Sequence, residues 1–408
     1  MQQGISAAAS RLAGAIDPDA MLAHTERWSA INSGTGNLAG LSAMAEELAD
    51  AFSALPGEIS LEEPAPVTVI APDGRETAQE HGRHLVLRVR PDAERRFLLT
   101  GHMDTVYPPD HPFQQVTRID ADMLNGPGTA DMKGGIAVIL AALQVFEGTG
   151  AAQGVGYDVM INSDEETGSL SSAPLIARLA QGKHAALTYE PSALPDGTLA
   201  HARGGSGNYS LIVTGRSAHA GRNPHDGRNA IVAAAALAIA LKGLEHEALS
   251  VNPARIEGGS ANNVVPDHAV LRFNIRPKNT EAARDFTGSL ERLIARITAE
   301  HEVSVSCHGG ISRPPKPVDP AAARLFGLVQ SCCKELGQHF AWRDSGGVCD
   351  GNNIAACGVP VVDTMGVRGG AIHSQDEFLI VPSLAEIGRA RVGKECGYQC
   401  RSRWSPYH

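Results

Sequence analysis

Three short apolar segments in the first half of the chain each lead into a residue that can bind a metal or transfer a proton. These segments and the residues that follow them are 97–100 with His102, 157–161 with Glu165 and Glu166, and 185–189 with Glu190. Patterns typical of helices separate the segments, so strands alternate with helices along the chain. In open α/β sheets, functional sites usually lie at the carboxyl ends of strands. The sequence therefore predicts an α/β fold with its site at that end of the sheet.

The pattern of elements changes in the middle of the chain and then returns. Helical spacing of apolar residues covers 17–55, 133–146, 229–243, about 280–299 and 319–336, and begins again near 382. Further strands are expected at 84–90, 208–214, 269–275 and 359–364. Because 408 residues are too many for one small core, we expect two domains. The first is discontinuous, 1–202 and 316–390, and an α+β domain, 203–315, is inserted into it.

Residues 391–408 differ from the rest of the chain. They depart from the helical pattern that starts at Leu384, and they contain two of the seven cysteines and one of the three tryptophans. Cys396 and Cys400 could bind a metal, but no second pair of ligands lies nearby in the sequence. We expect a disordered or non-native tail here.

Charge and composition exclude several classes of protein. A formal net charge of −10 argues against a nucleic-acid partner, which usually requires a basic excess. No uninterrupted run of about 18 apolar residues occurs, so we expect no membrane span. The first residues show no signal-peptide pattern. The seven cysteines include no C-x-x-C pair, which favours reduced thiols and a cytoplasmic location.

Two acidic motifs follow strands directly. Side chains alternate in direction along an extended backbone, so one of Glu165 and Glu166 can bind a metal while the other transfers a proton. In His102-x-Asp104, the carboxylate can accept the second N–H of the imidazole and leave the other nitrogen for a metal. The alternatives are a solvated acidic turn and a solvated loop.

Two glycine-rich loops supply further candidates. Asp131 lies in 126–135, just before a helix, where it could bind a metal or cap the helix. His373 lies in 369–377, where it could bind a metal or be a surface histidine. The candidate metal ligands are therefore His102, Asp131, Glu166, Glu190 and His373. Two imidazoles and three carboxylates suit two zinc ions that share one carboxylate. Cobalt or manganese could replace zinc, and an acidic cluster without metal is the alternative.

These spaced motifs resemble those of the dizinc metallohydrolases that include aminoacylase, acetylornithine deacetylase, succinyl-diaminopimelate desuccinylase and the bacterial glutamate carboxypeptidases. The similarity runs from about residue 20 to 390 and is greatest for the glutamate carboxypeptidase type, whose variant of the motif has a glutamate at the position of Glu190. The resemblance implies a zinc-peptidase-like catalytic domain with a mixed central sheet flanked by helices. It also implies that the inserted domain acts as a lid and forms a homodimer.

The resemblance further implies roles for individual residues of the catalytic domain. The carboxylate of Asp131 would bridge the two zinc ions of each subunit. The peptide bond between Asp131 and Met132 would be cis. The remaining ligands would be His102 and Glu190 at one zinc, and Glu166 and His373 at the other. Asp104 would orient His102, and Glu165 would be the general base acting on a water between the zinc ions.

The same resemblance extends to the inserted domain and to one loop of the catalytic domain. His219, in 215–221, would reach the active site of the partner subunit, and Asn263 would bind substrate. Arg276 and Arg313 fall where relatives hold a substrate carboxylate, although Arg276 could instead be a surface charge. Arg368 departs from the family pattern, so it could line the pocket and alter specificity, or it could face the solvent.

The sequence thus predicts a cytoplasmic, homodimeric, zinc-dependent amide hydrolase of the carboxypeptidase or deacylase type. Its substrate would be an N-acyl amino acid or short peptide with a free carboxylate. One alternative is an aminopeptidase-type tripeptidase, which would need an acidic group to hold the substrate's ammonium. Another is a non-catalytic metal- or peptide-binding protein, against which the intact Glu165 counts.

Overall fold

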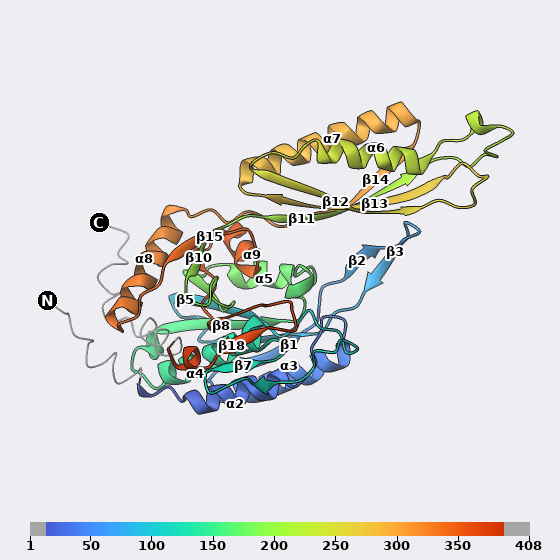
Figure 1. Cartoon of the computed structure of the whole chain (residues 1–408). Helices are drawn as coiled ribbons and strands as arrows, with labels where there is room; N and C mark the ends of the chain where they lie inside the picture. The colour runs from blue at the N-terminus through green and yellow to red at the C-terminus, as the bar shows by residue number, and fades with distance from the viewer. Residues whose placement is uncertain (1–13, 387–408) are drawn as a thin grey trace.

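A six-stranded mixed sheet forms the centre of the computed structural model, which describes residues 14–386 (Figure 1). Strands β8, β5, β9 and β16 run parallel to one another, and β4 and β1 continue the sheet in antiparallel pairing. The strands are β1 (Glu58–Glu62), β4 (His84–Val89), β5 (Arg95–His102), β8 (Val155–Asn162), β9 (Ala185–Thr188) and β16 (Val361–Val362). Because the parallel strands end at one edge, the residues that follow β5, β8 and β9 come together there. The expected α/β fold with a mixed central sheet is confirmed.

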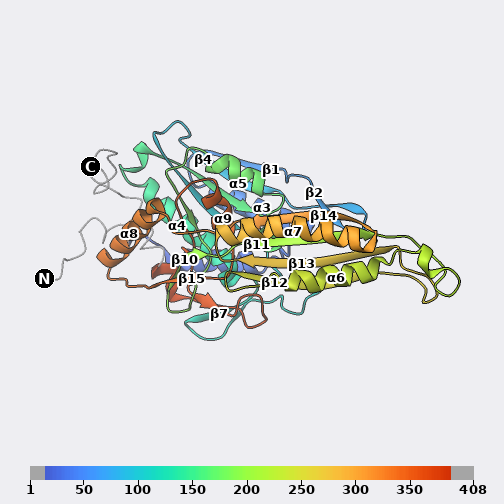
Figure 2. The same cartoon turned by 90° about the horizontal axis from the view of Figure 1, so that it is seen from above.

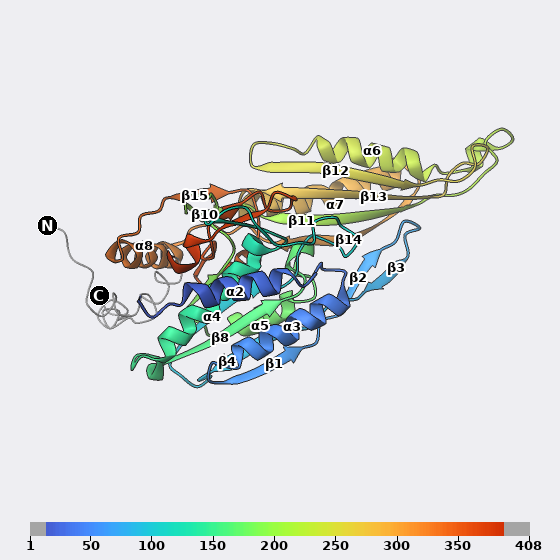
Figure 3. The same cartoon turned by 60° about the horizontal axis from the view of Figure 1, so that its bottom comes forward.

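Helices cover both faces of this sheet, because successive strand residues point in opposite directions. Leu85 and Leu87 belong to the core formed with α2 (Pro18–Ser29), α3 (Leu38–Phe52) and α4 (Gly134–Glu147). Val86 belongs to the core formed with α5 (Ala173–Ala180) and α9 (Asp350–Ala356) on the other face. Figure 3 shows α2, α3 and α4 on the same face of the sheet, and α2 packs beside α4. Helix α8 (Pro320–Glu335) packs beside β16.

The helical stretch predicted for 17–55 is divided into two helices, each with its own N-cap. Asp17 accepts hydrogen bonds from the main-chain N–H groups of Asp19 and Ala20 at 3.1 Å. Asn37 accepts one from Gly40 at 3.2 Å. A side-chain acceptor satisfies N–H groups that have no partner within the first turn, so the second cap begins a second helix. The strand expected at 359–364 is also shorter than predicted, since β16 contains two residues.

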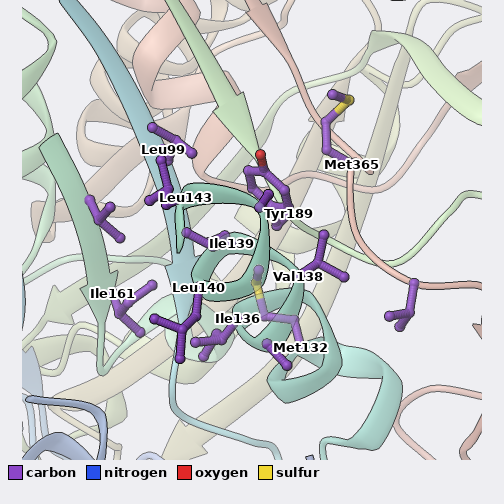
Figure 4. Close-up of a cluster of buried hydrophobic side chains, with 14 of the residues drawn as sticks. Leu99, Met132, Ile136, Val138, Ile139, Leu140, Leu143, Ile161, Tyr189 and Met365 are labelled. Carbon is purple, nitrogen blue, oxygen red and sulfur yellow. The ribbon is translucent and has the colours of Figure 1, made fainter. Parts of the chain in front are cut away.

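Helix α4 is buried against the central sheet (Figure 4). Its Ile136 and Leu140 share one buried cluster with Leu99 of β5 and Ile161 of β8. Together with the preceding turn, the helix is long and apolar enough to cross a membrane, but 83% of its apolar window is buried inside the protein. A helix that is apolar on all sides and packed on a sheet is a core helix.

A second sheet, in the order β12-β13-β11-β14, carries two helices on one face (Figure 2). Its elements are β11 (Ser206–Thr214), α6 (Ala230–Lys242), β12 (Leu249–Gly258), β13 (His268–Pro277), α7 (Thr280–His301) and β14 (Ser304–Arg313). Leu211, Leu271 and Ile275 of the strands are buried with Leu237 of α6 and Phe286 of α7. These elements lie within the predicted inserted segment and have a core of their own.

The other face of this second sheet meets a hairpin of the part that contains the central sheet (Figure 1). This part corresponds to the predicted catalytic domain, and we call it the catalytic part. The hairpin consists of β2 (Val67–Ile70) and β3 (Glu76–Gln79). Arg272 of β13 donates a hydrogen bond from Nη2 to the carbonyl of Ile70 at 2.7 Å. His268, also on β13, lies 3.4 Å from the carbonyl of Pro72. The inserted segment therefore contacts the catalytic part at a point distant in sequence from its two ends.

The two chain crossings between the parts form one joint, which we define as Arg203, Lys316 and Asp363. Arg203 and Lys316 pair as neighbouring antiparallel residues, with N–H to carbonyl distances of 3.0 and 2.9 Å. Both side chains bind Asp363: Arg203 at 2.8 and 2.9 Å, and Lys316 at 3.1 Å. All three side chains are buried. One carboxylate thus fixes the entry and the exit of the inserted segment.

Smaller elements surround the end of the central sheet where the site lies. β10 (Leu199–Arg203) pairs in parallel with β15 (Trp342–Ser345). A four-stranded sheet contains β6 (Thr117–Arg118), β7 (Met123–Asn125), β17 (Gly369–Gly370) and β18 (Phe378–Ile380). This sheet places the loop that carries His373 beside the turn Thr129–Lys133, although more than 200 residues separate them in sequence. The predicted tail at 391–408 lies outside the described residues.

Candidate metal centre

The structure brings all five predicted ligands together in two groups that share Asp131. His102, Asp131 and Glu190 form one group, and Asp131, Glu166 and His373 form the other. Asp131 Oδ1 lies 3.1 Å from His102 Nε2, and its Oδ2 lies 3.4 Å from His373 Nε2. Glu190 is 3.7 Å from His102, and Glu166 is 3.1 Å from His373. Each carboxylate oxygen of Asp131 therefore faces a different group.

The ligands reach this point from different elements. His102 is the last residue of β5, Glu190 follows β9, and Glu166 lies in the short turn Glu165–Thr167 after β8. Asp131 lies in the turn Thr129–Lys133, where its backbone is not helical (φ −115°, ψ 89°) and its peptide bond to Met132 is cis, as expected. Helix α4 begins without a side-chain cap hydrogen bond. The alternative role of Asp131 as a helix cap is therefore wrong.

Asp104 holds several groups of the site at once. His102 Nδ1 lies 3.0 Å from the main-chain carbonyl of Asp104 and 3.4 Å from its carboxylate. The carboxylate also accepts hydrogen bonds from the main-chain N–H groups of Glu165 and Glu166, at 3.1 and 3.2 Å, and from Thr35 Oγ1 at 2.7 Å. It thus fixes both the imidazole and the backbone of the two glutamates.

Burial and nearby charged groups shift the pKa values of the proposed ligands. Burial, with the charge of Asp131 close by, raises the pKa of Glu166 to about 7. Burial also raises the pKa of Glu190. Hydrogen bonds to Asp131 and Glu166 raise the pKa of His373 to about 11.

The donor set and its spacing fit metal ions. Zinc lies about 2.0–2.2 Å from nitrogen and oxygen ligands, so the atoms that share one ion are roughly 3–4 Å apart. The distances of 3.1–3.7 Å within the two groups agree with this spacing. Imidazole and carboxylate are also the ligand types that zinc, cobalt and manganese accept.

Glu165 belongs to neither ligand group within residues 14–386, and its carboxylate pairs with Arg313 instead. Arg313 Nη2 lies 2.7 Å from Glu165 Oε1 and also donates to the Glu165 carbonyl at 2.9 Å and to Ser169 Oγ at 2.7 Å. Burial raises the pKa of Glu165 well above its ordinary value, although Arg313 opposes this shift. Arg313, expected to hold substrate, is thus already bound to the residue expected to be the base.

A cavity of about 430 Å³ opens over the ligands. Its wall includes Glu165 and four of the five ligands, all except His102. In the described part of the chain, the other charged residues that line it are Arg203, Arg276 and Arg313. Arg276 is exposed, and its Nε donates to Asn274 Oδ1 at 3.0 Å. Apart from the proposed metal ligands and Glu165, the charged side chains that line this cavity are therefore all positive.

Three predicted site residues belong neither to the wall of this cavity nor to the ligands and Asp104. His219 and Asn263 are exposed neighbours at one end of the inserted segment, where Ala220 N–H donates to the Asn263 carbonyl at 2.9 Å. Arg368 Nη1 pairs with Glu386 at 3.0 Å, and its Nε donates to the Pro195 carbonyl at 2.8 Å. Arg368 is therefore bound by the protein itself and does not line this cavity, which was one of the two positions considered for it.

Three residues that support the site were not predicted from the sequence. Glu377 binds the backbone of the turn that carries Asp131, Arg203 lines the cavity from the joint, and Thr35 binds Asp104. Each acts through a contact between distant parts of the chain. For Glu377 the available signal was its place four residues after His373, in an acidic loop.

Two groups of imidazole and carboxylate ligands, joined by one carboxylate at the carboxyl end of an α/β sheet, define the class of metal-dependent hydrolases. The family model described as Peptidase family M20/M25/M40 matches residues 98–390. The chain belongs to this family. It is a metallohydrolase that acts on amide bonds.

Two relatives named for an enzyme activity match more than two thirds of this chain and of their own length. Carboxypeptidase G2 from Pseudomonas sp. (strain RS-16) is 30% identical over 300 residues, which cover 72% of this chain and 71% of that protein. Succinyl-diaminopimelate desuccinylase from Maricaulis maris (strain MCS10) is 30% identical over 315 residues, covering 71% and 78%. The resemblance drawn from the motifs is confirmed.

Solved structures share the fold. The aminopeptidase PepT from Bacillus cereus ATCC 10987 matches with a TM-score of 0.70 at 22% identity, covering 94% of this chain and 100% of that one. The M20 family metallo-carboxypeptidase Sso-CP2 from Sulfolobus solfataricus matches with a TM-score of 0.67 at 15% identity, covering 92% and 98%. At these identities the likeness concerns architecture alone.

Proposed function

We propose that the protein is a dizinc amide hydrolase that removes the acyl group from an N-acyl amino acid or cleaves a short peptide with a free carboxylate. The observation that carries this proposal is the shared position of Asp131, whose two oxygens face His102 and His373 at 3.1 and 3.4 Å. A carboxylate in this position suits two metal ions side by side. Cobalt or manganese would fit the same ligands.

In this proposal Asp131 is the bridging ligand, with His102 and Glu190 on one side and Glu166 and His373 on the other. Bound zinc would polarise the scissile carbonyl and lower the pKa of a water toward neutrality. Glu165 lines the cavity beside the ligands, so its carboxylate can take the proton of the attacking water and deliver it to the leaving amine. Asp104 keeps Glu165 in place by binding its main-chain N–H.

The charge of the cavity favours a substrate with a carboxylate. A tripeptidase would need an acidic group for the substrate's ammonium, but every acidic residue that lines the described cavity is a proposed ligand or the proposed base. Arg276 is the arginine best suited to hold the carboxylate, because Arg203 and Arg313 are buried and bound to Asp363 and Glu165. Carboxypeptidase G2, by its name, acts on a chain with a free carboxyl end, which agrees with this choice.

We also propose a homodimer formed through the inserted segment. On α6, Val232 and Ile239 are seven positions apart, so they lie on one face of the helix, and they are 51% and 76% exposed. The neighbouring β12 is an edge strand with many exposed residues. An apolar helix face beside an open sheet edge suits two-fold pairing. His219 would then enter the partner's cavity and donate an N–H to the developing oxyanion, with Asn263 close by.

The cytoplasm is the proposed location, because Cys307, Cys333, Cys349 and Cys357 carry free thiols.

The function is tested by a hydrolysis screen in which metal content is measured on the same sample. The substrates are N-acyl amino acids, the same compounds with the carboxylate converted to an amide, and di- and tripeptides with and without a blocked amino end. Equal hydrolysis of acid and amide would refute carboxylate recognition, and a requirement for a free amino end would favour the tripeptidase.

A further inference from the structure

The carboxylate of Glu377 lies behind the turn that carries Asp131. Its Oε1 accepts hydrogen bonds from the main-chain N–H groups of Ala130 and Asp131, both at 3.1 Å. Its Oε2 accepts one from the N–H of Gly128, also at 3.1 Å. The Glu377 side chain is buried, with 1% of the residue exposed. A single side chain therefore binds three main-chain N–H groups within the four residues that end at the proposed bridging ligand.

Glu377 is itself held firmly from the other side. The hydroxyl of Tyr107 donates to Oε2 at 3.2 Å and to the carbonyl of Ser374 at 2.8 Å. Asn125 donates to the carbonyl of Glu377 at 2.7 Å, at the start of the β18–β7 ladder. The loop between Ser374 and Glu377 begins directly after His373. The segment that carries His373 and the turn that carries Asp131 are thus joined through one carboxylate.

Buried main-chain N–H groups need acceptors, and a neutral side chain could supply some of them. A carboxylate so close to Asp131 instead adds negative charge beside a proposed ligand, which is costly unless nearby dipoles and cations compensate. Three main-chain N–H dipoles point at the Glu377 carboxylate, and the Tyr107 hydroxyl is a fourth donor. The two carboxylate oxygens accept from all four donors, whereas an amide side chain has one acceptor oxygen and cannot do so.

We propose that Glu377 is a positioning residue of the metal centre. It fixes the main chain at Asp131 relative to the His373 loop, and so keeps both carboxylate oxygens of Asp131 aimed at the two ligand groups. Glu377 does not contact metal or substrate in this role. The inference rests on the proposed metal centre. It adds the residue that holds the turn with Asp131 and the loop with His373 in place relative to each other.

Glu377→Gln is the direct test, because it keeps one acceptor oxygen and replaces the other by an NH₂ group facing a donor. Metal-depleted protein is titrated with Co²⁺ alone, and both the affinity and the visible absorption spectrum are recorded. Loss of a residue that orients metal ligands typically weakens metal binding about 10–100-fold. We expect a loss of this size in Glu377→Gln, with an altered cobalt spectrum. Glu386→Gln is the matched control, because Glu386 pairs with Arg368 and not with the proposed metal centre. This variant should bind cobalt as the wild type does.

Folded Glu377→Gln that binds cobalt within threefold of the wild type, with an unchanged spectrum, would overturn the proposal. If Glu377→Gln does not fold, Tyr107→Phe decides, because it removes one hydrogen bond to the same carboxylate and keeps the ring. A weaker affinity and a changed spectrum in Tyr107→Phe support the proposal, and wild-type behaviour overturns it. Wild-type protein that takes up no cobalt would instead refute the metal centre itself. If the wild type binds two cobalt ions and Glu377→Gln binds them equally well, the role of Glu377 is refuted but the metal centre is not.

Discussion

Replacing Asp363 by asparagine should destabilise the protein strongly, because the carboxylate neutralises two buried cations at the joint. Asp363 is fully buried, and Arg203 and Lys316 are 7% and 2% exposed. Without the carboxylate, Arg203 keeps the Gly347 carbonyl and Lys316 keeps the His201 carbonyl as acceptors. Breaking a buried ion pair from one side costs about 3–5 kcal/mol. Two buried cations without a counter-charge place the cost of Asp363→Asn in the upper half of that range. With an unfolding entropy of about 2.1 cal/mol/K per residue over 408 residues, its melting temperature should fall by roughly 5–6 °C.

The assay is thermal unfolding of Asp363→Asn beside Asp344→Asn. Asp344 also pairs with a basic side chain, His201 at 3.2 Å, but is 76% exposed, so its loss should cost less than about 1 kcal/mol. Although burial opposes it, Arg203 and Lys316 lower the pKa of Asp363 below its ordinary value of 3.8. The stabilisation is therefore complete above that value and is lost as the pH falls through the lower, folded-state pKa. A loss in Asp363→Asn no larger than that in Asp344→Asn at pH 7 would refute the reasoning.

Three further predictions concern the site and the dimer. Glu165→Gln should keep its metal and lose about 10²–10⁴-fold in turnover; loss of zinc in a metal analysis, or near-normal turnover, would contradict this role. Mixing inactive His219→Ala with inactive Glu165→Gln should restore activity in hybrid dimers, since one site then has both residues intact. If subunit exchange is shown and activity stays absent, the shared site is refuted. Ile239→Glu should give a monomer in analytical ultracentrifugation, whereas Ile119→Glu, at an isoleucine that is 57% exposed in the catalytic part, should not.

The parts of the fold that could be predicted from sequence are those with a strong local pattern. The segment 84–90 alternates and the segment 157–161 is a mostly apolar run, and they correspond to the buried strands β4 and β8. β12 and β14 were not predicted, because both are edge strands with many exposed residues and no clear alternation. The break between α2 and α3 was also missed, since it depends on a single cap at Asn37.

The same distinction applies to the site. The five ligands could be predicted because each lies in a short motif directly after a strand or within a glycine-rich turn. Arg313 was placed near substrate, but the three-dimensional contact that decides its partner, Glu165, spans 148 positions. Glu377 and Asp363 are acidic residues with no local motif, and they acquire roles only when the chain brings distant backbone or cations to them. Contacts of this kind have no periodicity that a sequence can display.

The antiparallel pairing of Arg203 with Lys316 has a topological consequence. The chain leaves the catalytic part and returns to it at two hydrogen-bonded neighbours, so the catalytic part closes on itself without the intervening residues. A short turn between these two positions would join β10 to the segment before α8 with no change of path. Segments whose ends lie side by side are the ones that tolerate insertion and removal. The inserted segment can accordingly differ in length or be exchanged while the strand order of the central sheet stays the same.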